Sequence, residues 1–248
     1  MILIKVVLFS LLLPGIVEDD FGNVFLCQEQ YDLYYQRIEQ FTEQNCSIPP
    51  GGIVFIGNSI TQGFLLQKYF PGARVYNRGI VADKIGMGDD GGVLKRLDVS
   101  CFQLKPSRIF LMIGINDVAD GRRSVSRIAS GYQLLIDTIL DSLPWVELYV
   151  HSILPTRDNY SNLNPRIDSL NELLQQIIDD RSMEYYVRYI DLHMLFKDQY
   201  GNLHEEFTWD GIHLTERGYT LWADFISTLV NPDYMYHQRW ILSDSLNN

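Results

Sequence analysis

Short apolar segments alternate with longer amphipathic ones along most of the chain. The short segments are rich in Val, Ile, Phe and Tyr, a composition typical of buried β-strands. Because segments with helical periodicity lie between them, the pattern indicates a parallel sheet with helices on both faces. The sequence therefore predicts an α/β fold with five strands, at residues 53–56, 74–76, 109–113, 147–152 and 186–190.

The longer segments repeat apolar residues every three or four positions, which is the spacing of one helix face. Ser and Thr at their beginnings supply N-caps, and prolines mark their ends or their first turns. Four such helices are predicted: one over Tyr31 to Phe41, one from Ser124 to before Pro144, one opening at Asn164-Pro165, and one from Thr215 to before Pro232.

Chemically unusual polar residues follow the predicted strands. In parallel sheets, ligands bind outside the carboxyl ends of the strands, so these residues are expected to meet at one edge. In chain order they are Ser59, Asn77-Arg78-Gly79, Gly114-Ile115-Asn116-Asp117, Leu154-Pro155-Thr156, and Asp210 with His213. Their convergence predicts a functional site at that edge.

Length and charge narrow the class of protein. The 248 residues suit one domain, which we expect over residues 25–240, and the hydrophobic content of 46% is ordinary for a globular protein. The net charge of −11 argues against binding to a nucleic-acid backbone or an anionic membrane surface, both of which require clustered Lys and Arg. A neutral or cationic small substrate is favoured.

Residues 1–17 differ from the rest of the chain. Residues 2–13 are apolar except for Lys5 and Ser10. This segment is too short to span a bilayer, so no stable membrane insertion is expected, but its length suits the core of a signal peptide. It predicts export to the periplasm or the medium. A buried N-terminal strand in a cytoplasmic protein, or a misassigned start codon, is the alternative.

Three cysteines, Cys27, Cys46 and Cys101, do not form a disulfide framework. Cys27 and Cys46 could pair if the protein is exported, or all three could be small buried residues. No Cys-x-x-Cys pair is present in the sequence, so a structural zinc is not predicted.

Ser59, His213 and Asp210 have the residue types needed for acyl transfer. A serine hydroxyl is a poor nucleophile at neutral pH and needs a neighbouring base, for which His213 is the best candidate. Asp210, three residues earlier, could bind the other ring nitrogen and stabilise the imidazolium. Alternatively, Asp210 caps the last helix and His213 packs beneath it.

Such a site also needs hydrogen-bond donors for an oxyanion. The candidates are the backbone N–H groups of Ser59 and Gly79 and the side-chain amide of Asn116. A glycine at position 79 would let the backbone approach a substrate closely. The alternative is that Gly79 is a turn glycine and Asn116 a capping residue.

Four segments in this order resemble the four sequence blocks of the SGNH (GDSL-type) hydrolases. They are Gly57-Asn58-Ser59-Ile60, Asn77-Arg78-Gly79, Gly114-Ile115-Asn116-Asp117 and Asp210-Gly211-Ile212-His213. The resemblance implies a flavodoxin-like three-layer α/β/α fold and ester hydrolysis. It also implies that Ser59 is the nucleophile, His213 the base and Asp210 its orienting partner, with Ser59, Gly79 and Asn116 as oxyanion donors.

The resemblance has one departure, because the middle residue of the first block is usually Asp and here is Asn58. Position 61 is Thr, so the serine does not lie in the Gly-x-Ser-x-Gly elbow of an α/β-hydrolase. Asn58, Arg78 and Trp209 are the side chains expected to contact substrate. For Arg78 a structural ion pair is the alternative, and for Trp209 a place in the core.

These observations predict a serine esterase that removes a short acyl group, expected to be acetyl on a carbohydrate, without metal or cofactor. Its partner would be a small-molecule or glycan ester. A lysophospholipase, lipase or thioesterase acting on longer chains is the alternative enzyme. A non-catalytic binding module on the same scaffold is the alternative of another class.

Overall fold

The computed structural model describes residues 17–18, 24–25, 28–88 and 91–231. Residues 1–16 of the predicted signal peptide and Cys27 lie outside the described residues, so both the signal peptide and the Cys27–Cys46 disulfide stay predictions. Cys46 is exposed just beyond the first helix, and Cys101 is buried. Two short strands, β1 (Val17–Glu18) and β2 (Val24–Phe25), pair antiparallel.

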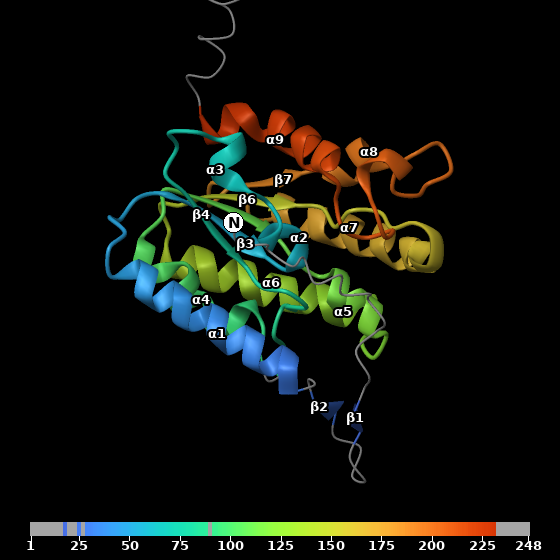
Figure 1. Cartoon of the computed structure of the whole chain (residues 1–248), viewed down its shortest axis with the longest axis horizontal. Helices are drawn as coiled ribbons and strands as arrows, with labels where there is room; N and C mark the ends of the chain where they lie inside the picture. The colour runs from blue at the N-terminus through green and yellow to red at the C-terminus, as the bar shows by residue number, and fades with distance from the viewer. Residues whose placement is uncertain (1–16, 19–23, 26–27, 89–90, 232–248) are drawn as a thin grey trace, which may run out of the picture.

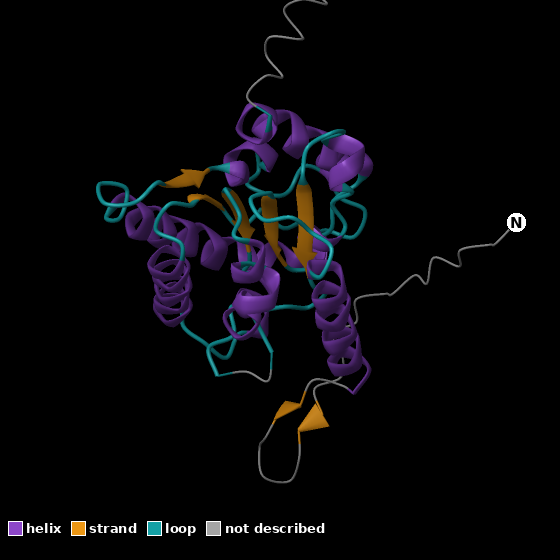
Figure 2. Ribbon diagram, turned by 90° about the vertical axis from the view of Figure 1, so that its left-hand side faces the viewer, coloured by secondary structure: helices purple, strands orange, loops and turns teal. Residues whose placement is uncertain are grey.

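A five-stranded parallel sheet forms the centre of the molecule, between helices on either side (Figures 1 and 2). Its strand order is β4-β3-β5-β6-β7, so the first strand of the sheet lies next to its edge and the chain winds outward in both directions. The strands are β3 (Ile53–Gly57), β4 (Val75–Gly79), β5 (Arg108–Met112), β6 (Glu147–His151) and β7 (Val187–Ile190). The predicted fold is confirmed.

Helices α9, α3 and α8 lie on one side of the sheet, and α1, α4 and α6 on the other (Figure 1), where α7 packs against α6. The helices are α1 (Gln28–Asn45), α2 (Ser59–Gln62), α3 (Leu66–Tyr69), α4 (Leu97–Ser100), α5 (Ile115–Asp120), α6 (Val125–Ser142), α7 (Asn164–Asp179), α8 (Leu192–Phe196) and α9 (Glu216–Val230), and the 3-10 turns are η1 (Val93–Arg96), η2 (Phe102–Leu104), η3 (Asp158–Leu163) and η4 (Glu205–Phe207).

The predicted helix starts are confirmed by their caps. The Ser124 hydroxyl accepts a hydrogen bond from the Arg127 N–H at 3.2 Å, and the Thr215 hydroxyl accepts one from the Gly218 N–H at 3.2 Å. Each cap satisfies a backbone donor that has no partner inside its helix. A proline lies in the first turn of α7, where its missing N–H does no harm.

Aromatic rings line one face of the sheet in register. Phe55, Phe110 and Tyr149 occupy paired positions on β3, β5 and β6, with neighbouring ring centroids 4.6 and 4.9 Å apart. Trp222 of α9 closes this layer and is 5.3 Å from the ring of His151 at the end of β6. Close packing of these rings holds β3, β5 and β6 in place, and the site lies at the carboxyl ends of these strands.

One strand end differs from its prediction. The sequence suggested that the second strand stops at Tyr76, but β4 continues through Gly79, which pairs with Gly57 of β3. Asn77-Arg78-Gly79 is therefore strand rather than loop. The pairing of β4 with β3 outweighs the turn propensity of Asn and Gly.

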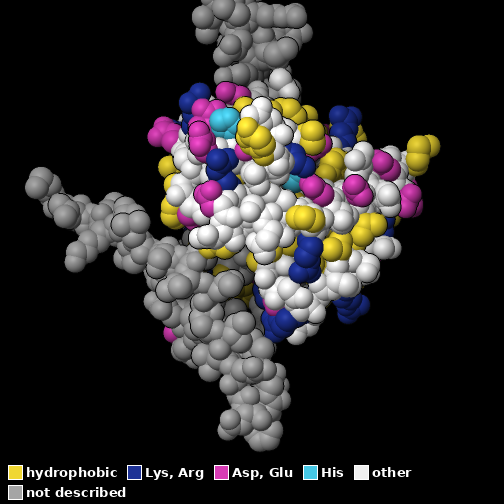
Figure 3. Space-filling view, turned by 90° about the vertical axis from the view of Figure 1, so that its right-hand side faces the viewer, with side chains coloured by type: hydrophobic (Ala, Val, Ile, Leu, Met, Phe, Trp, Pro, Cys, Tyr) yellow, Lys and Arg dark blue, Asp and Glu magenta, His cyan; other side chains and the backbone are white. Residues whose placement is uncertain are grey.

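On the face shown in Figure 3, acidic side chains lie among basic and hydrophobic ones. Within the described ranges, no helix has the length and apolar character needed to cross a membrane.

Candidate active site

Ser59, His213 and Asp210 form a hydrogen-bonded chain. The Ser59 hydroxyl lies 2.9 Å from Nε2 of His213, and Nδ1 of the same ring lies 2.6 Å from Oδ2 of Asp210. Ser59 and His213 are 154 residues apart in the sequence, and the fold brings them together at the carboxyl edge of the sheet. The His213 and Asp210 side chains are each 17% exposed, so the chain of groups is shielded but reachable.

The position of Ser59 follows from the end of β3. All five residues of β3 are buried, and Ser59 begins α2 with only Asn58 between them. Oδ1 of Asn58 accepts the N–H of Ile60 at 3.0 Å and so caps α2. A side chain at Gly57 would lie 2.3 Å from the Met112 carbonyl, so a glycine is required for this tight exit from the sheet.

The loop that carries Asp210 and His213 is held by hydrogen bonds within the loop and by one from the segment after β6. Oδ1 of Asp210 accepts the backbone N–H groups of Ile212 at 2.9 Å and His213 at 2.7 Å. Gly211 has a φ of +94°, and its carbonyl accepts the Arg157 N–H at 2.9 Å. The Asp-x-x-His spacing thus lets one carboxylate bind both the ring and the backbone of His213.

The electrostatics keep Asp210 ionised. Burial raises the pKa of its carboxyl, but the hydrogen bonds from the His213 side chain and from two backbone N–H groups outweigh burial, and the pKa lies below its usual value. An ionised carboxylate only accepts hydrogen bonds, so Nδ1 of His213 carries the proton. Nε2 is then free to accept the Ser59 proton.

The structure does not support Gly79 as an oxyanion donor. Its N–H donates to Oδ1 of Asn77 at 2.9 Å, within its own strand. A Cβ at position 79 would lie 2.3 Å from the Gln62 nitrogen, so this glycine permits close packing of β4 against α2. The prediction assumed a loop at position 79, where the structure has a strand.

Ala82, which the sequence reasoning missed, occupies the turn beyond β4. It has a φ of +59°, unusual for a residue other than glycine and frequent at functional sites. Among the residues that the structure describes, no acceptor binds its N–H. The carbonyl of the next residue, Asp83, accepts the amide of Asn116 at 2.9 Å. Nothing in the residue type of Ala82 signals this conformation.

Ser59 and Asn116 each carry an N–H that the described hydrogen bonds leave open. Ser59 is the first residue of α2, so its N–H has no partner inside the helix. The half-buried amide of Asn116 uses one N–H for Asp83 and keeps a second.

The three expected substrate-contacting side chains have different surroundings. Arg78 does not face the site: it is buried, and its guanidinium donates to Oε1 of Gln44 at 2.7 Å and Oδ1 of Asn45 at 2.9 Å on α1. Being in the strand, it points to the opposite face of the sheet from Asn77. The buried side chain of Asn58 caps α2. Trp209 is 59% exposed and stacks on the His213 ring at 5.5 Å, so it is not core.

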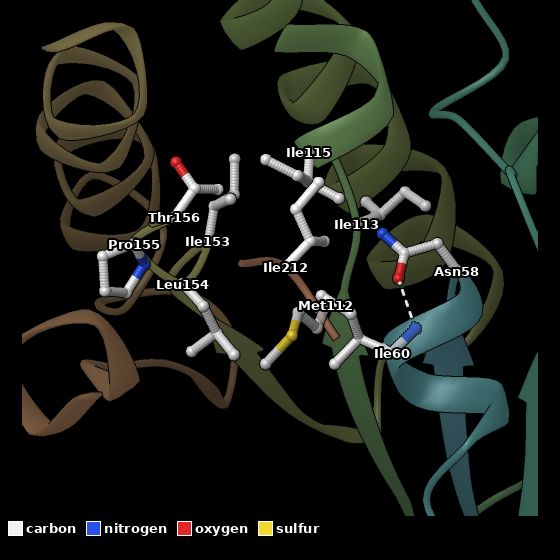
Figure 4. Close-up of a pocket in the computed structure, with 10 residues that line it drawn as sticks. All are labelled: Asn58, Ile60, Met112, Ile113, Ile115, Ile153, Leu154, Pro155, Thr156 and Ile212. Atoms are coloured by element: carbon white, nitrogen blue, oxygen red, sulfur yellow. Dashed lines mark hydrogen bonds between the residues drawn. The ribbon is translucent and has the colours of Figure 1, made fainter. Parts of the chain in front are cut away.

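A narrow apolar pocket is lined by residues that neighbour Ser59 and His213 in the sequence (Figure 4). Asn58 and Ile60 lie on one side of it, residues 153–156 after β6 lie on the other, and Ile212 lies between them. Its free volume is about 10 Å³, the room that one water-sized group occupies. Its lining residues are Asn58, Ile60, Met112, Ile113, Ile115, Ile153, Leu154, Pro155, Thr156 and Ile212.

Within residues 17–18, 24–25, 28–88 and 91–231, no group of three or more His, Cys, Asp or Glu side chains is arranged to hold a metal ion.

Comparison with protein-family models places residues 55–221 in the GDSL-like lipase/acylhydrolase family. Over 84 residues, which are 34% of this chain, the sequence is 31% identical to the N-acylneuraminate cytidylyltransferase of Escherichia coli O18:K1:H7. The match covers 19% of that protein, so the chain spans about a fifth of the length of this curated relative.

Solved structures share the fold. A protein from Streptococcus pneumonia described as a platelet activating factor matches with a TM-score of 0.72 and 25% identity, over 82% of this chain and 94% of that one. A GDSL-like lipase from Bacteroides thetaiotaomicron has a TM-score of 0.65 and 17% identity, over 79% and 97%. An acetylxylan esterase from Geobacillus stearothermophilus has a TM-score of 0.57 and 19% identity, over 74% and 96%.

Proposed function

The chain belongs to the GDSL-like lipase/acylhydrolase family, as its sequence blocks indicated, and from this premise we propose that it is a serine esterase that works through an acyl-enzyme. The observation that carries the proposal is the hydrogen-bonded chain from Ser59 through His213 to Asp210. It supplies a nucleophile, a base and an orienting carboxylate in the order that acyl transfer requires.

In the first half-reaction, Nε2 of His213 takes the Ser59 proton as the hydroxyl oxygen attacks the ester carbonyl. Asp210 holds the ring through Nδ1 and stabilises the imidazolium that forms. The imidazolium then gives its proton to the departing alcohol oxygen, which leaves an ester on Ser59. In the second half-reaction, His213 deprotonates a water molecule that attacks this ester, and the imidazolium returns the proton to the Ser59 oxygen as the acid is released.

The negative charge of the tetrahedral intermediate needs donors that are already in place. We assign this role to the N–H of Ser59, the N–H of Ala82 and the second amide N–H of Asn116. Ala82 replaces Gly79 because its N–H is unoccupied by described residues and its neighbour Asp83 binds Asn116. Each such donor is worth on the order of 3–4 kcal/mol in the transition state.

The pocket beside Ser59 supports a short acyl group. Its lining is apolar except for Asn58 and Thr156, and its small free volume of about 10 Å³ favours a methyl group over an alkyl chain. Forcing additional methylenes into a well-packed site costs roughly 1–3 kcal/mol. We therefore propose that the acyl group is acetyl.

A carbohydrate is the acceptor that we favour. Trp209 presents its free face beside His213, and an exposed indole offers a flat apolar surface against which a sugar ring can pack. Acetylxylan esterases share the fold, and the curated relative is named for a sugar substrate. The proposed substrate class is an O-acetylated sugar or glycan.

A series of p-nitrophenyl esters, from acetate to octanoate, tests both parts of the proposal. We expect kcat/KM to be highest for acetate and at least about tenfold lower for octanoate, because the longer chain does not fit the pocket. The matched control, Ser59→Ala, should lower kcat by at least about 10⁴-fold while its melting temperature stays near that of wild type. A maximum of kcat/KM at octanoate would favour a lipase. Full activity of Ser59→Ala would show that Ser59 is not the nucleophile.

A further inference from the structure

Arg96, the last residue of η1, is buried with only 1% of its surface exposed. Its Nε donates to Oδ2 of Asp83 at 2.8 Å, and its Nη1 donates to the Arg78 carbonyl at 2.9 Å and to the Ser100 hydroxyl at 2.8 Å. Its Nη2 donates to the Gly57 carbonyl at 3.1 Å and lies 2.8 Å from Oδ2 of Asp83. Every nitrogen of the guanidinium therefore has an acceptor.

Apart from Ser100, these acceptors belong to the backbone segments that carry the proposed oxyanion donors. Gly57 ends β3, two residues before Ser59. The Arg78 carbonyl lies near the end of β4, just before the turn at residues 80–83. Asp83 closes that turn directly after Ala82, and its own carbonyl binds Asn116. One guanidinium thus ties the nucleophile turn to the turn of Ala82.

Stability alone does not explain such a group. The free energy lost when an ion pair is desolvated is only partly offset by the attraction between its charges. A protein with a hydrophobic pair of similar size in its place is often as stable. What the guanidinium supplies is geometry, because its planar fork fixes several acceptors in one plane. A lysine at this position could not bind all of these acceptors at once.

We propose that Arg96 is a positioning residue that fixes the distance between the Ser59 turn and the Ala82 turn, and so sets the oxyanion geometry without touching substrate. This inference rests on the proposed function. Because a misplacement of about 1 Å in an active site lowers rates by on the order of 10²-fold, loss of this tie should appear in kcat rather than in substrate affinity.

Arg78 provides a matched control within the same sheet edge. It is also a fully buried arginine, but its guanidinium donates to side chains of α1 and stacks over the Phe41 ring at 4.6 Å. Arg78→Lys and Arg96→Lys are therefore the same chemical change at equal burial, and only the second loosens the backbone of the site.

The test compares these two variants on an acetyl ester. We expect Arg96→Lys to lower kcat by on the order of 100-fold with KM changed by less than about threefold, at a temperature where melting shows it to be folded. Arg78→Lys should keep kcat within about threefold of wild type, even if its melting temperature falls by as much as that of Arg96→Lys. Equal kcat values in the two variants would overturn the proposal.

Amide hydrogen exchange gives a readout that does not depend on turnover. In Arg96→Lys the amides of Ile80 and Asp83, which donate to the Gly57 carbonyl at 3.1 Å and the Ile80 carbonyl at 3.2 Å, should exchange at least about tenfold faster than in wild type, and in Arg78→Lys they should not. If Arg96→Lys does not fold, Asp83→Asn replaces it, since it keeps the size and removes the charge that pairs with Arg96. Unchanged exchange at both amides would overturn the positioning role, whereas a wild-type protein inactive on all esters would overturn the proposed function instead.

Discussion

Two segments enclose the site from opposite sides and are held in different ways. The turn at residues 80–83, after β4, is tied by the buried ion pair of Arg96 with Asp83. The segment at residues 153–156, after β6, lines the apolar pocket and is tied by neutral amides from α7. We refer to the first as the oxyanion turn and to the second as the acyl wall.

The amides of the acyl wall act as substitute strand partners. Asn171 accepts the N–H of Ile153 at 2.8 Å and donates to its carbonyl at 2.9 Å. Asn164 does the same for Thr156, at 2.8 and 2.9 Å. Both come from one helix, seven residues apart, so they lie two turns from each other on the same face.

The difference matches what each side is proposed to do. Beside an apolar pocket, a charge would need its own partner and water, whereas a carboxamide satisfies a buried backbone amide with no net charge. Beside the oxyanion, the end of β3 and the turn after β4 must keep a fixed distance, and a guanidinium has enough donors to bind both. Neutral amide hydrogen bonds are therefore enough to hold the acyl wall, whereas the oxyanion turn needs the several donors of a guanidinium.

Asp83→Leu should break the oxyanion turn with the largest effect on stability. It leaves the Arg96 charge buried without its carboxylate, and removal of one partner of a buried ion pair costs about 3–5 kcal/mol. Chemical denaturation measures the loss. Glu216→Gln is the control, because its ion pair with Lys68 is exposed and its removal should leave stability near that of wild type. Equal losses in the free energy of unfolding for Asp83→Leu and Glu216→Gln would show that the buried ion pair contributes no more than the exposed one.

Asn171→Leu should weaken the acyl wall. It leaves the N–H and the carbonyl of Ile153 without their partners, and each unsatisfied buried neutral group costs about 1–3 kcal/mol. Because the wall can then move, the ratio of kcat/KM for butyrate to that for acetate should rise by at least about threefold. Asp83→Leu should not change this ratio, since it acts on the other side of the site. An unchanged ratio in both variants would show that the wall does not select the acyl group.

The strand that precedes the acyl wall contributes a sensitivity to acid through His151, the last residue of β6. Both ring nitrogens are buried without a hydrogen-bond partner among the described residues, and burial lowers the pKa of His151 from 6.5 to about 3. Between those values the unfolded chain binds a proton that the folded protein does not, so stability falls as the pH falls. At about pH 5 the loss is roughly 2 kcal/mol.

His151→Phe isolates this contribution. Phenylalanine preserves the stacking on Phe110, whose ring lies 5.7 Å away, and does not titrate. Denaturation of wild type and variant between neutral pH and about pH 4 should show a shallower decline for the variant. Parallel curves would mean that other groups, such as paired carboxylates, account for the acid sensitivity.

Comparison of individual residues shows where sequence reasoning sufficed. Asp210 and His213 lie three residues apart, so their contact is local, and their geometry could be expected from spacing. Ser124 and Thr215 mark helix starts for the same reason. Ser59 could be placed at the end of a strand because the apolar run before it is continuous and buried.

The errors have a common origin in contacts between distant segments. Gly79 was assigned to a loop, but its pairing with Gly57 keeps it in the sheet. Arg78 was expected to contact substrate, but its place in the strand directs it to α1. Arg96 follows Lys95 in the sequence and resembles a surface charge there, whereas the structure buries it at the junction of two strands.

The sequence by itself determined the order of strands and helices along the chain, the candidate catalytic side chains and the family, because periodicity, capping and motif order are properties of neighbouring residues. Only the tertiary structure decided which backbone N–H groups are open and which guanidinium holds them. A backbone donor carries no signature in its side chain, so its availability depends on whether a distant segment binds it. Ala82, Gly79 and Arg96 could therefore be assigned only once the strands were in register.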